Sequence, residues 1–137
     1  MFTQIRRNVF KSLCIIFTII FLVTGCSSAS SVNLKIYGES ENWKVKHELK
    51  VDGIDSTEEK NLYIENKNNE KRIDTINFAL YRDGDLTTKG TGIPLDNNKY
   101  IKRSKNMGAA SPSKESKYVI EIEWDGQKET ISLNNTN

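Results

Sequence analysis

Few side chains of this 137-residue chain have the types and spacing that catalysis or metal binding requires. His47 is the only histidine, so a hydrolase triad and a multi-histidine metal site both lack parts. It alternates in sequence with polar residues and shares a face with Val45 and Leu49, which favours a partly buried structural imidazole over a general base. We therefore predict that the chain is not an enzyme, has no catalytic residue and needs no cofactor.

Acidic and glycine-rich turns offer little more. Asp83-Gly84-Asp85, with Asp55 or Asp96, could supply carboxylate oxygens to calcium, but the other spaced acids of a calcium loop are missing. Gly90-Thr91-Gly92 has too few glycines and no following helix to hold a phosphate. We interpret both segments as turns or loops and predict no metal site.

The two cysteines lie in the N-terminal segment. Arg6, Arg7 and Lys11 precede an apolar block at residues 12–24, which is the order of a secretory signal. The block is shorter than the roughly 20 apolar residues that a membrane-spanning helix needs. The arginine pair also has some likeness to a twin-arginine export signal, but we prefer an ordinary basic segment on the general secretory route.

Leu22-Val23-Thr24-Gly25-Cys26 resembles the lipobox of bacterial lipoproteins. The resemblance implies cleavage before Cys26 and transfer of diacylglycerol to its thiol, and two acyl chains give a stable membrane anchor. We therefore expect a signal peptide at residues 1–25, a lipidated cysteine and tether at residues 26–31, and a domain at residues 32–137. That domain would lie on the extracytoplasmic face of the cell membrane, held there by the lipid.

Cleavage would change the composition of the domain. Three of the 20 basic residues and none of the 18 acidic residues lie in the leader, so 17 basic residues would face 18 acidic ones. The mature chain would then be close to neutral, which gives no reason to expect a nucleic-acid partner. Cys14 lies in the leader and Cys26 would carry the lipid, so no cysteine remains for a disulfide or a thiolate nucleophile.

Apolar and polar residues alternate in the mature part of the chain, as is typical of β-strands. Residues 42–52 alternate almost perfectly between apolar and polar, and in residues 118–124 Tyr118, Ile120, Ile122 and Trp124 alternate with Val119, Glu121 and Glu123, which indicates strands with one buried face. Asp125-Gly126 between alternating segments predicts a tight hairpin that pairs Ile120 with Ile131 and Tyr118 with Leu133. About seven short strands without helical periodicity predict an all-β, antiparallel two-sheet sandwich, with a small barrel as the alternative.

Four segments carry a family resemblance: the lipobox at Cys26, Gly38-Glu39-Ser40-Glu41-Asn42-Trp43, Gly90-Thr91-Gly92, and the closing Ile122-Glu123-Trp124-Asp125-Gly126-Gln127-Lys128-Glu129. With them the chain resembles a group of small, uncharacterised Gram-positive bacterial lipoproteins with an immunoglobulin-like β-sandwich. The resemblance implies a location and a fold. It implies no activity and no binding residues.

The densest basic segment is the binding candidate, and its members are Lys99, Tyr100, Lys102, Arg103 and Lys105. Near a membrane it could meet an anionic surface, although lysines that protect an edge strand from aggregation give the same pattern. Trp43 and Trp124 each end an apolar face and are expected in the core or at its rim.

We expect a monomeric, non-catalytic binding or accessory module of the cell envelope that contacts an envelope protein or an anionic wall polymer. Its working surface would be two loops, at residues 83–98 and 104–117. The alternative is an immunity or exclusion lipoprotein that blocks a toxin or phage component at the membrane.

Overall fold

The computed structural model describes residues 31–53, 57–68, 70–107 and 112–136. The expected signal peptide, the lipidation site Cys26 and most of the tether therefore lie outside the described residues, as does Asp55.

Eight antiparallel strands and no helix make up the described part of the chain. In chain order they are β1 (Val32–Glu39), β2 (Trp43–Asp52), β3 (Thr57–Asn66), β4 (Thr75–Arg82), β5 (Asp85–Pro94), β6 (Lys99–Met107), β7 (Tyr118–Trp124) and β8 (Gln127–Asn135). They form a single sheet in the order β5-β4-β7-β8-β1-β2-β3-β6. The all-β, antiparallel fold expected from the sequence is confirmed.

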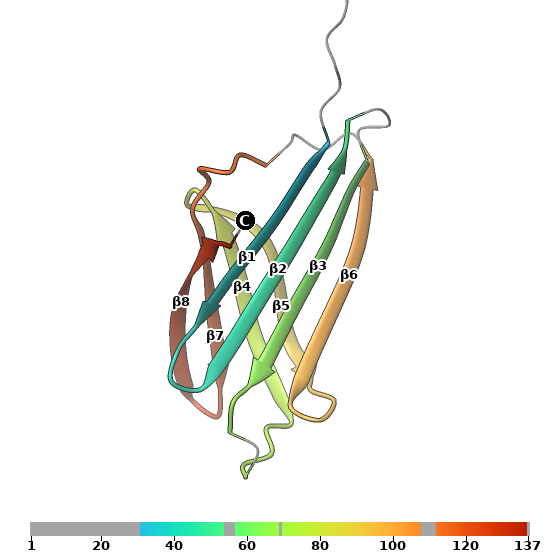
Figure 1. Cartoon of the computed structure of the whole chain (residues 1–137). Coiled ribbons are helices and arrows are strands. Elements are labelled where there is room, and N and C mark those ends of the chain that lie inside the picture. The colour runs from blue at the N-terminus through green and yellow to red at the C-terminus, as the bar shows by residue number, and fades with distance from the viewer. Residues whose placement is uncertain (1–30, 54–56, 69, 108–111, 137) are drawn as a thin grey trace, which may run out of the picture.

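The sheet is nearly closed into a barrel, because its two edge strands come close together. β1 and β8 share only two paired positions, and Figure 1 shows β1, β2, β3 and β6 in front of the other four strands. On the side away from β1 and β8, Lys102 Nζ on β6 donates a hydrogen bond of 3.0 Å to Thr88 Oγ1 on β5. We call the meeting of β5 and β6 the seam.

The strand count and the layer arrangement differ from the sequence prediction. The structure has eight strands in one sheet instead of about seven in two, so the small barrel describes it more closely. The missed strand is β5, because Gly90, Gly92 and Pro94 predict a loop there. Gly90 is needed for packing: a Cβ at this position would lie 2.5 Å from the Phe78 ring. β5 occupies most of the segment that was expected to be a loop at residues 83–98. β6 continues to Met107, so the start of the loop expected at residues 104–117 is also strand.

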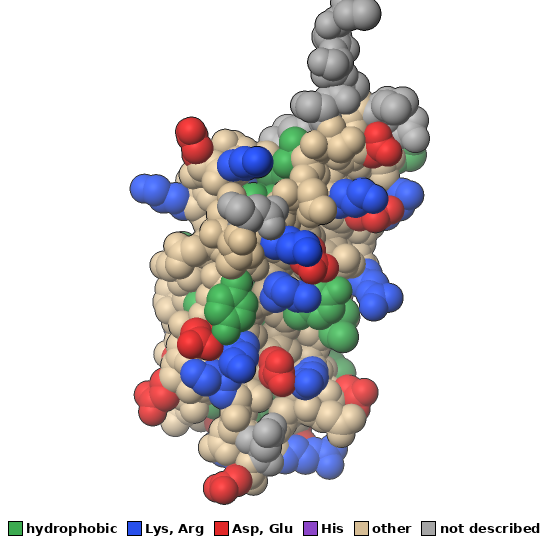
Figure 2. Space-filling model, viewed as in Figure 1, with side chains coloured by type: hydrophobic (Ala, Val, Ile, Leu, Met, Phe, Trp, Pro, Cys, Tyr) green, Lys and Arg blue, Asp and Glu red, His purple; other side chains and the backbone are tan. Residues whose placement is uncertain are grey.

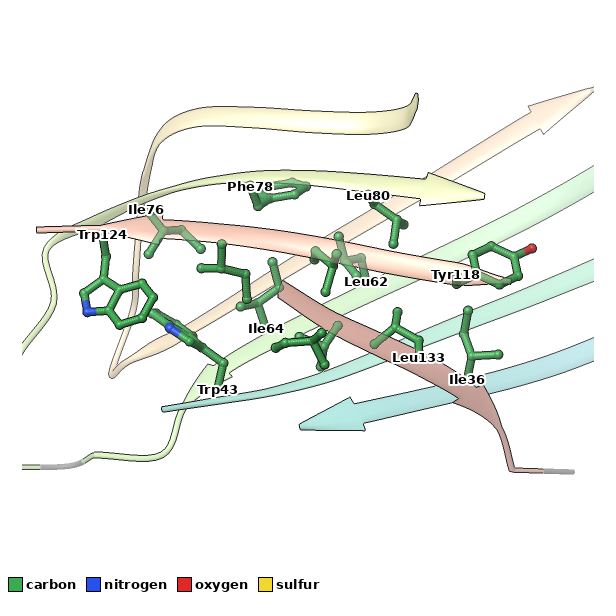
Figure 3. Close-up of a cluster of buried hydrophobic side chains, with 14 of the residues drawn as sticks. Ile36, Trp43, Leu62, Ile64, Ile76, Phe78, Leu80, Tyr118, Trp124 and Leu133 are labelled. Atoms are coloured by element: carbon green, nitrogen blue, oxygen red, sulfur yellow. The ribbon is translucent and has the colours of Figure 1, made fainter. Parts of the chain in front are cut away.

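The core follows the alternation in the sequence. Every second residue of β2, beginning with Trp43, is buried inside the barrel. Trp43 and Trp124 are 0% and 6% exposed and pack edge to face, with ring centroids 5.2 Å apart. Figure 3 shows this pair at one end of the buried cluster and Tyr118 at the other. Both tryptophans therefore belong to the core, as expected.

The predicted hairpin between β7 and β8 is confirmed in its register. Ile120 pairs with Ile131, and Tyr118 pairs with Leu133. Asp125 and Gly126 have φ angles of 46° and 74°, as a two-residue turn of this hand requires.

Two of the segments that carry the family resemblance contact each other. Glu129 on β8 accepts hydrogen bonds from the Ser40 hydroxyl and, at 2.6 Å, from Asn42 Nδ2 in the β1–β2 turn. Burial of the Glu129 carboxylate raises its pKa, but these hydrogen bonds outweigh the burial, and the net pKa is lowered. The contact ties the β1–β2 turn to β8.

Candidate functional site

The basic residues singled out by the sequence lie on two opposite faces of β6. Lys99, Arg103 and Lys105 point outward, while the ring of Tyr100 and the ammonium of Lys102 point into the barrel. A strand sends successive side chains to opposite faces, so residues that are adjacent in sequence cannot form one patch here. The structure therefore divides the candidate site into an outer part and an inner part.

Acidic neighbours on β3 compensate part of the outer charge. Lys99 Nζ lies 3.1 Å from Glu65 Oε1, and Lys105 Nζ lies 3.4 Å from Glu59 Oε1. Exposed pairs of this kind contribute little to stability, but they reduce the positive field of the strand. Arg103 has no ion pair within 4.0 Å among the described residues.

A row of larger side chains crosses the outer face beside these charges. Tyr37, Lys46, Tyr63 and Ile101 stand directly opposite one another on β1, β2, β3 and β6. Tyr37 is 37% exposed and Ile101 is 51% exposed. We call these four residues the outer row; they line one shallow groove. Figure 2 shows hydrophobic side chains on this face with basic and acidic side chains around them.

Neighbouring groups hold the aromatic rings of the outer row. The Tyr37 hydroxyl donates to Glu39 Oε2 at 2.7 Å, and this hydrogen bond raises the pKa of the tyrosine. Lys46 Nζ lies 4.3 Å from the centroid of the Tyr63 ring, within the range of a cation–π contact. The outer row is therefore an ordered surface in which two aromatic rings and an isoleucine accompany one cation, Lys46. The sequence did not predict the outer row, because its members come from four strands and the register between those strands cannot be read from the sequence.

Of the two inner residues, Lys102 lines a cavity of about 270 Å³ beneath the seam, whereas the Tyr100 ring packs against Phe78 and is not part of that lining. We call this cavity the seam cavity; its lining is His47, Leu49, Lys60, Leu62, Leu80, Arg82, Thr87, Thr88, Lys102, Ser104, Asn106 and Tyr118. These residues come from β2 to β7, so only the nearly closed sheet brings them together. The tryptophan end of the barrel is packed with apolar side chains, whereas this end holds most of the inward-facing polar ones.

His47 lies in the wall of the seam cavity and is 4% exposed. Its Nδ1 is 3.1 Å from the backbone oxygen of Asn61, and its ring packs edge to face on Tyr118 at 6.0 Å. Burial lowers the pKa of the imidazole, and Lys60 lowers it further, whereas the Asn61 oxygen and Glu58 raise it. The inward position expected for this histidine is confirmed, and the side chain is fully rather than partly buried.

Glu58 is an inward-facing acid that sequence reasoning did not single out. It is 1% exposed, and its Oε2 lies 2.7 Å from Lys60 Nζ. Its Oε1 has no hydrogen-bond partner among the described residues. The alternation that places Leu62 and Ile64 inside also places Lys60 and Glu58 inside, so this pattern, followed back toward Thr57, is the signal that could have found Glu58.

The acidic turn at Asp83-Gly84-Asp85 and the glycine segment at Gly90-Thr91-Gly92 are both part of the β structure. Asp83 has a φ of 53°, and its Oδ1 accepts a hydrogen bond of 2.8 Å from the Lys117 backbone nitrogen, which lowers the pKa of the carboxyl. Gly90-Thr91-Gly92 lies within β5. Within the described ranges, no three histidine, cysteine or acidic side chains gather closely enough to hold a metal ion. The predicted absence of catalysis and of a cofactor stays a prediction.

Comparisons with protein-family models, with curated proteins and with solved structures find no match to this chain. The resemblance to small Gram-positive lipoproteins therefore stays a prediction. In the part of the chain that the structure describes, no helix has the length and hydropathy to span a membrane.

Proposed function

We propose that the chain is a membrane-anchored surface lipoprotein whose barrel is a non-catalytic binding module of the cell envelope. The observation that carries this proposal is the outer row, an exposed line of two tyrosines, a lysine and an isoleucine across four strands. The diacylglycerol on Cys26 would hold the module at the extracytoplasmic face of the membrane as a monomer.

The chemistry of the outer row suits recognition of a protein. Tyrosine combines a large apolar ring with a hydroxyl and loses little conformational entropy on binding, and it is enriched where partners make strong contacts. The rings of Tyr37 and Tyr63 are already positioned by Glu39 and Lys46, so less order has to be gained on binding.

The charges beside the outer row favour an envelope protein over an anionic wall polymer. The rows on either side each contain both signs of charge. Their members are Lys35, Glu48, Asn61 and Arg103 on one side and Glu39, Lys44, Glu65 and Lys99 on the other. A uniformly anionic polymer would meet acids as often as lysines on part of this surface. A protein surface with its own mixed charges can complement both signs.

The expected immunoglobulin-like relationship remains part of the proposal. It is supported by the short β1–β8 junction, which leaves the sheet as two four-stranded halves, β1-β2-β3-β6 and β5-β4-β7-β8.

Photocrosslinking in intact cells tests the binding role. A photoreactive residue replaces Ile101 in the outer row or, as the matched control, exposed Lys89 on β5 in the other half of the sheet. We expect a defined envelope protein to be captured from position 101 and not from position 89. A captured toxin or phage component would point to the immunity alternative, while capture of wall polymer alone, or equal capture from both positions, would contradict the proposal.

A further inference from the structure

The seam cavity has a cationic lining without acids. Lys60, Arg82 and Lys102 reach it from β3, β4 and β6, and no aspartate or glutamate is among the residues that line it. Two of these cations have an acid nearby outside the lining. Lys60 pairs with Glu58, and Arg82 is close enough to Asp83 to lower the pKa of that carboxyl.

Lys102 differs from the other two. Its ammonium donates to the neutral Thr88 hydroxyl at 3.0 Å, and no acidic oxygen lies within 4.0 Å of it among the described residues. The side chain is half-buried, and a partly desolvated cation without a counter-ion is costly. An anion in the cavity would remove that cost.

Tyr118 supplies a second, independent observation. Its residue is 2% exposed, yet its hydroxyl makes no hydrogen bond of good geometry within the described residues, although Arg82 lies beside it. Figure 3 shows the hydroxyl pointing away from the packed aliphatic side chains. Burial raises the pKa of this phenol, so it remains a neutral donor. A buried donor without a partner, in the wall of a cationic cavity, indicates an absent acceptor.

We propose that the seam cavity binds a small organic oxyanion, with Lys102, Arg82 and Tyr118 on its charged end and Leu80 against its apolar part. The hydroxyl of Ser104 lies in the same lining and adds a further donor. The cavity of about 270 Å³ has room for a phosphate or carboxylate group together with a few carbon atoms. This site is inside the barrel and the outer row is outside it, so the proposal goes beyond the surface-binding function and does not depend on it.

Calorimetric titration of the full-length protein, purified in mild detergent, tests this site. The probes are inorganic phosphate, glycerol phosphate and succinate, which separate a free phosphate, a phosphate on an organic group and a carboxylate. We expect saturable binding of at least one probe and a loss of about tenfold or more in affinity in Lys102→Gln, because a charge-assisted hydrogen bond is removed. Lys105→Gln is the matched control, since it makes the same change on the outer face of the same strand.

Hydrogen exchange measured by mass spectrometry locates the bound probe and checks the variants. Binding should slow exchange in the peptides that contain β5 and β6, and Lys102→Gln without probe should exchange as the wild type does elsewhere. If Lys102→Gln does not fold, Arg82→Gln replaces it, because it removes another cation that the proposal places on the charged end of the anion. No saturable binding of any probe, or equal losses in the cavity variant and in Lys105→Gln, would overturn the proposal.

Discussion

Lys102 on β6 and Thr88 on β5 join the two edge strands of the sheet through a hydrogen bond of 3.0 Å. Nearby, the ring of Phe78 on β4 packs against that of Tyr100 on β6, with centroids 5.6 Å apart. These contacts nearly close the barrel and separate an inner, cationic cavity from an outer face with exposed tyrosines. The basic segment of β6 contributes to both.

The tryptophan pair should be a main support of the fold. Trp124→Ala removes a nearly buried indole and its edge-to-face contact with Trp43, so we expect a loss of about 3–5 kcal/mol in the free energy of unfolding. Urea denaturation of the wild type and the variant measures this loss. Leu86→Ala is the control, since Leu86 is 51% exposed and its truncation should change the stability by less than about 0.5 kcal/mol. Equal effects of the two substitutions would contradict the packing described.

Gly90 should tolerate no side chain without cost. In Gly90→Ala the new Cβ would lie 2.5 Å from the Phe78 ring and 2.7 Å from an Ile93 side-chain carbon, so we expect a destabilisation of about 1–3 kcal/mol. Thr91→Ala, at the exposed neighbouring position, should have a much smaller effect in the same denaturation assay. A neutral or stabilising Gly90→Ala would show that β5 can move away from the core.

His47 should make the fold sensitive to mild acid. Burial lowers the pKa of the folded imidazole below its ordinary value of 6.5, so below that pH the unfolded chain takes up a proton that the folded chain does not. Stability should therefore fall as the pH decreases from about 6.5, by at most about 1.4 kcal/mol per pH unit, until the pH reaches the folded pKa. The groups that face this ring are Lys60, Glu58 and Tyr118.

Denaturation midpoints measured between pH 7.5 and 5 check this pH dependence. His47→Gln should flatten the curve in that range, whereas the carboxyls with lowered pKa values, such as Glu129, should act only at lower pH. An unchanged slope in His47→Gln would assign the acid sensitivity to another group.

Cys26 should determine where the protein is found. If it carries the lipid, Cys26→Ser should move the protein from the membrane fraction to the soluble fraction and abolish incorporation of labelled palmitate, with the barrel still folded. Ser27→Ala, next to it in the sequence, is the control and should leave the protein on the membrane. Incorporation of labelled palmitate into Cys26→Ser at the wild-type level would contradict the lipid anchor.

Local patterns were sufficient for some parts of the fold and not for others. The alternation around His47 and the Asp125-Gly126 turn predict β2 and the β7–β8 register correctly, because both depend on neighbours in sequence. β5 could not be predicted, since Gly90 marks a close approach to Phe78 from another strand and resembles a loop signal in sequence. Closure of the sheet depends on the same kind of contact between distant residues.

The candidate site was predicted only in part for the same reason. The sequence drew attention to Lys102 and Arg103 together, but the pleat of β6 sends them to opposite faces. The seam cavity and the outer row each combine several strands, so neither can be assembled from a linear pattern.

The most direct test of the binding role uses the envelope protein captured at position 101. Calorimetry measures the affinity of this partner for the purified full-length wild type and for three variants. Tyr37→Ser and Tyr63→Ser change the outer row, and Tyr81→Ser on β4 is the control. We predict a loss of about tenfold or more for the outer-row variants, since contact tyrosines commonly contribute more than 1 kcal/mol, and no change for the control. Affinity that is unchanged in both outer-row variants would contradict the assignment of this face as the binding surface.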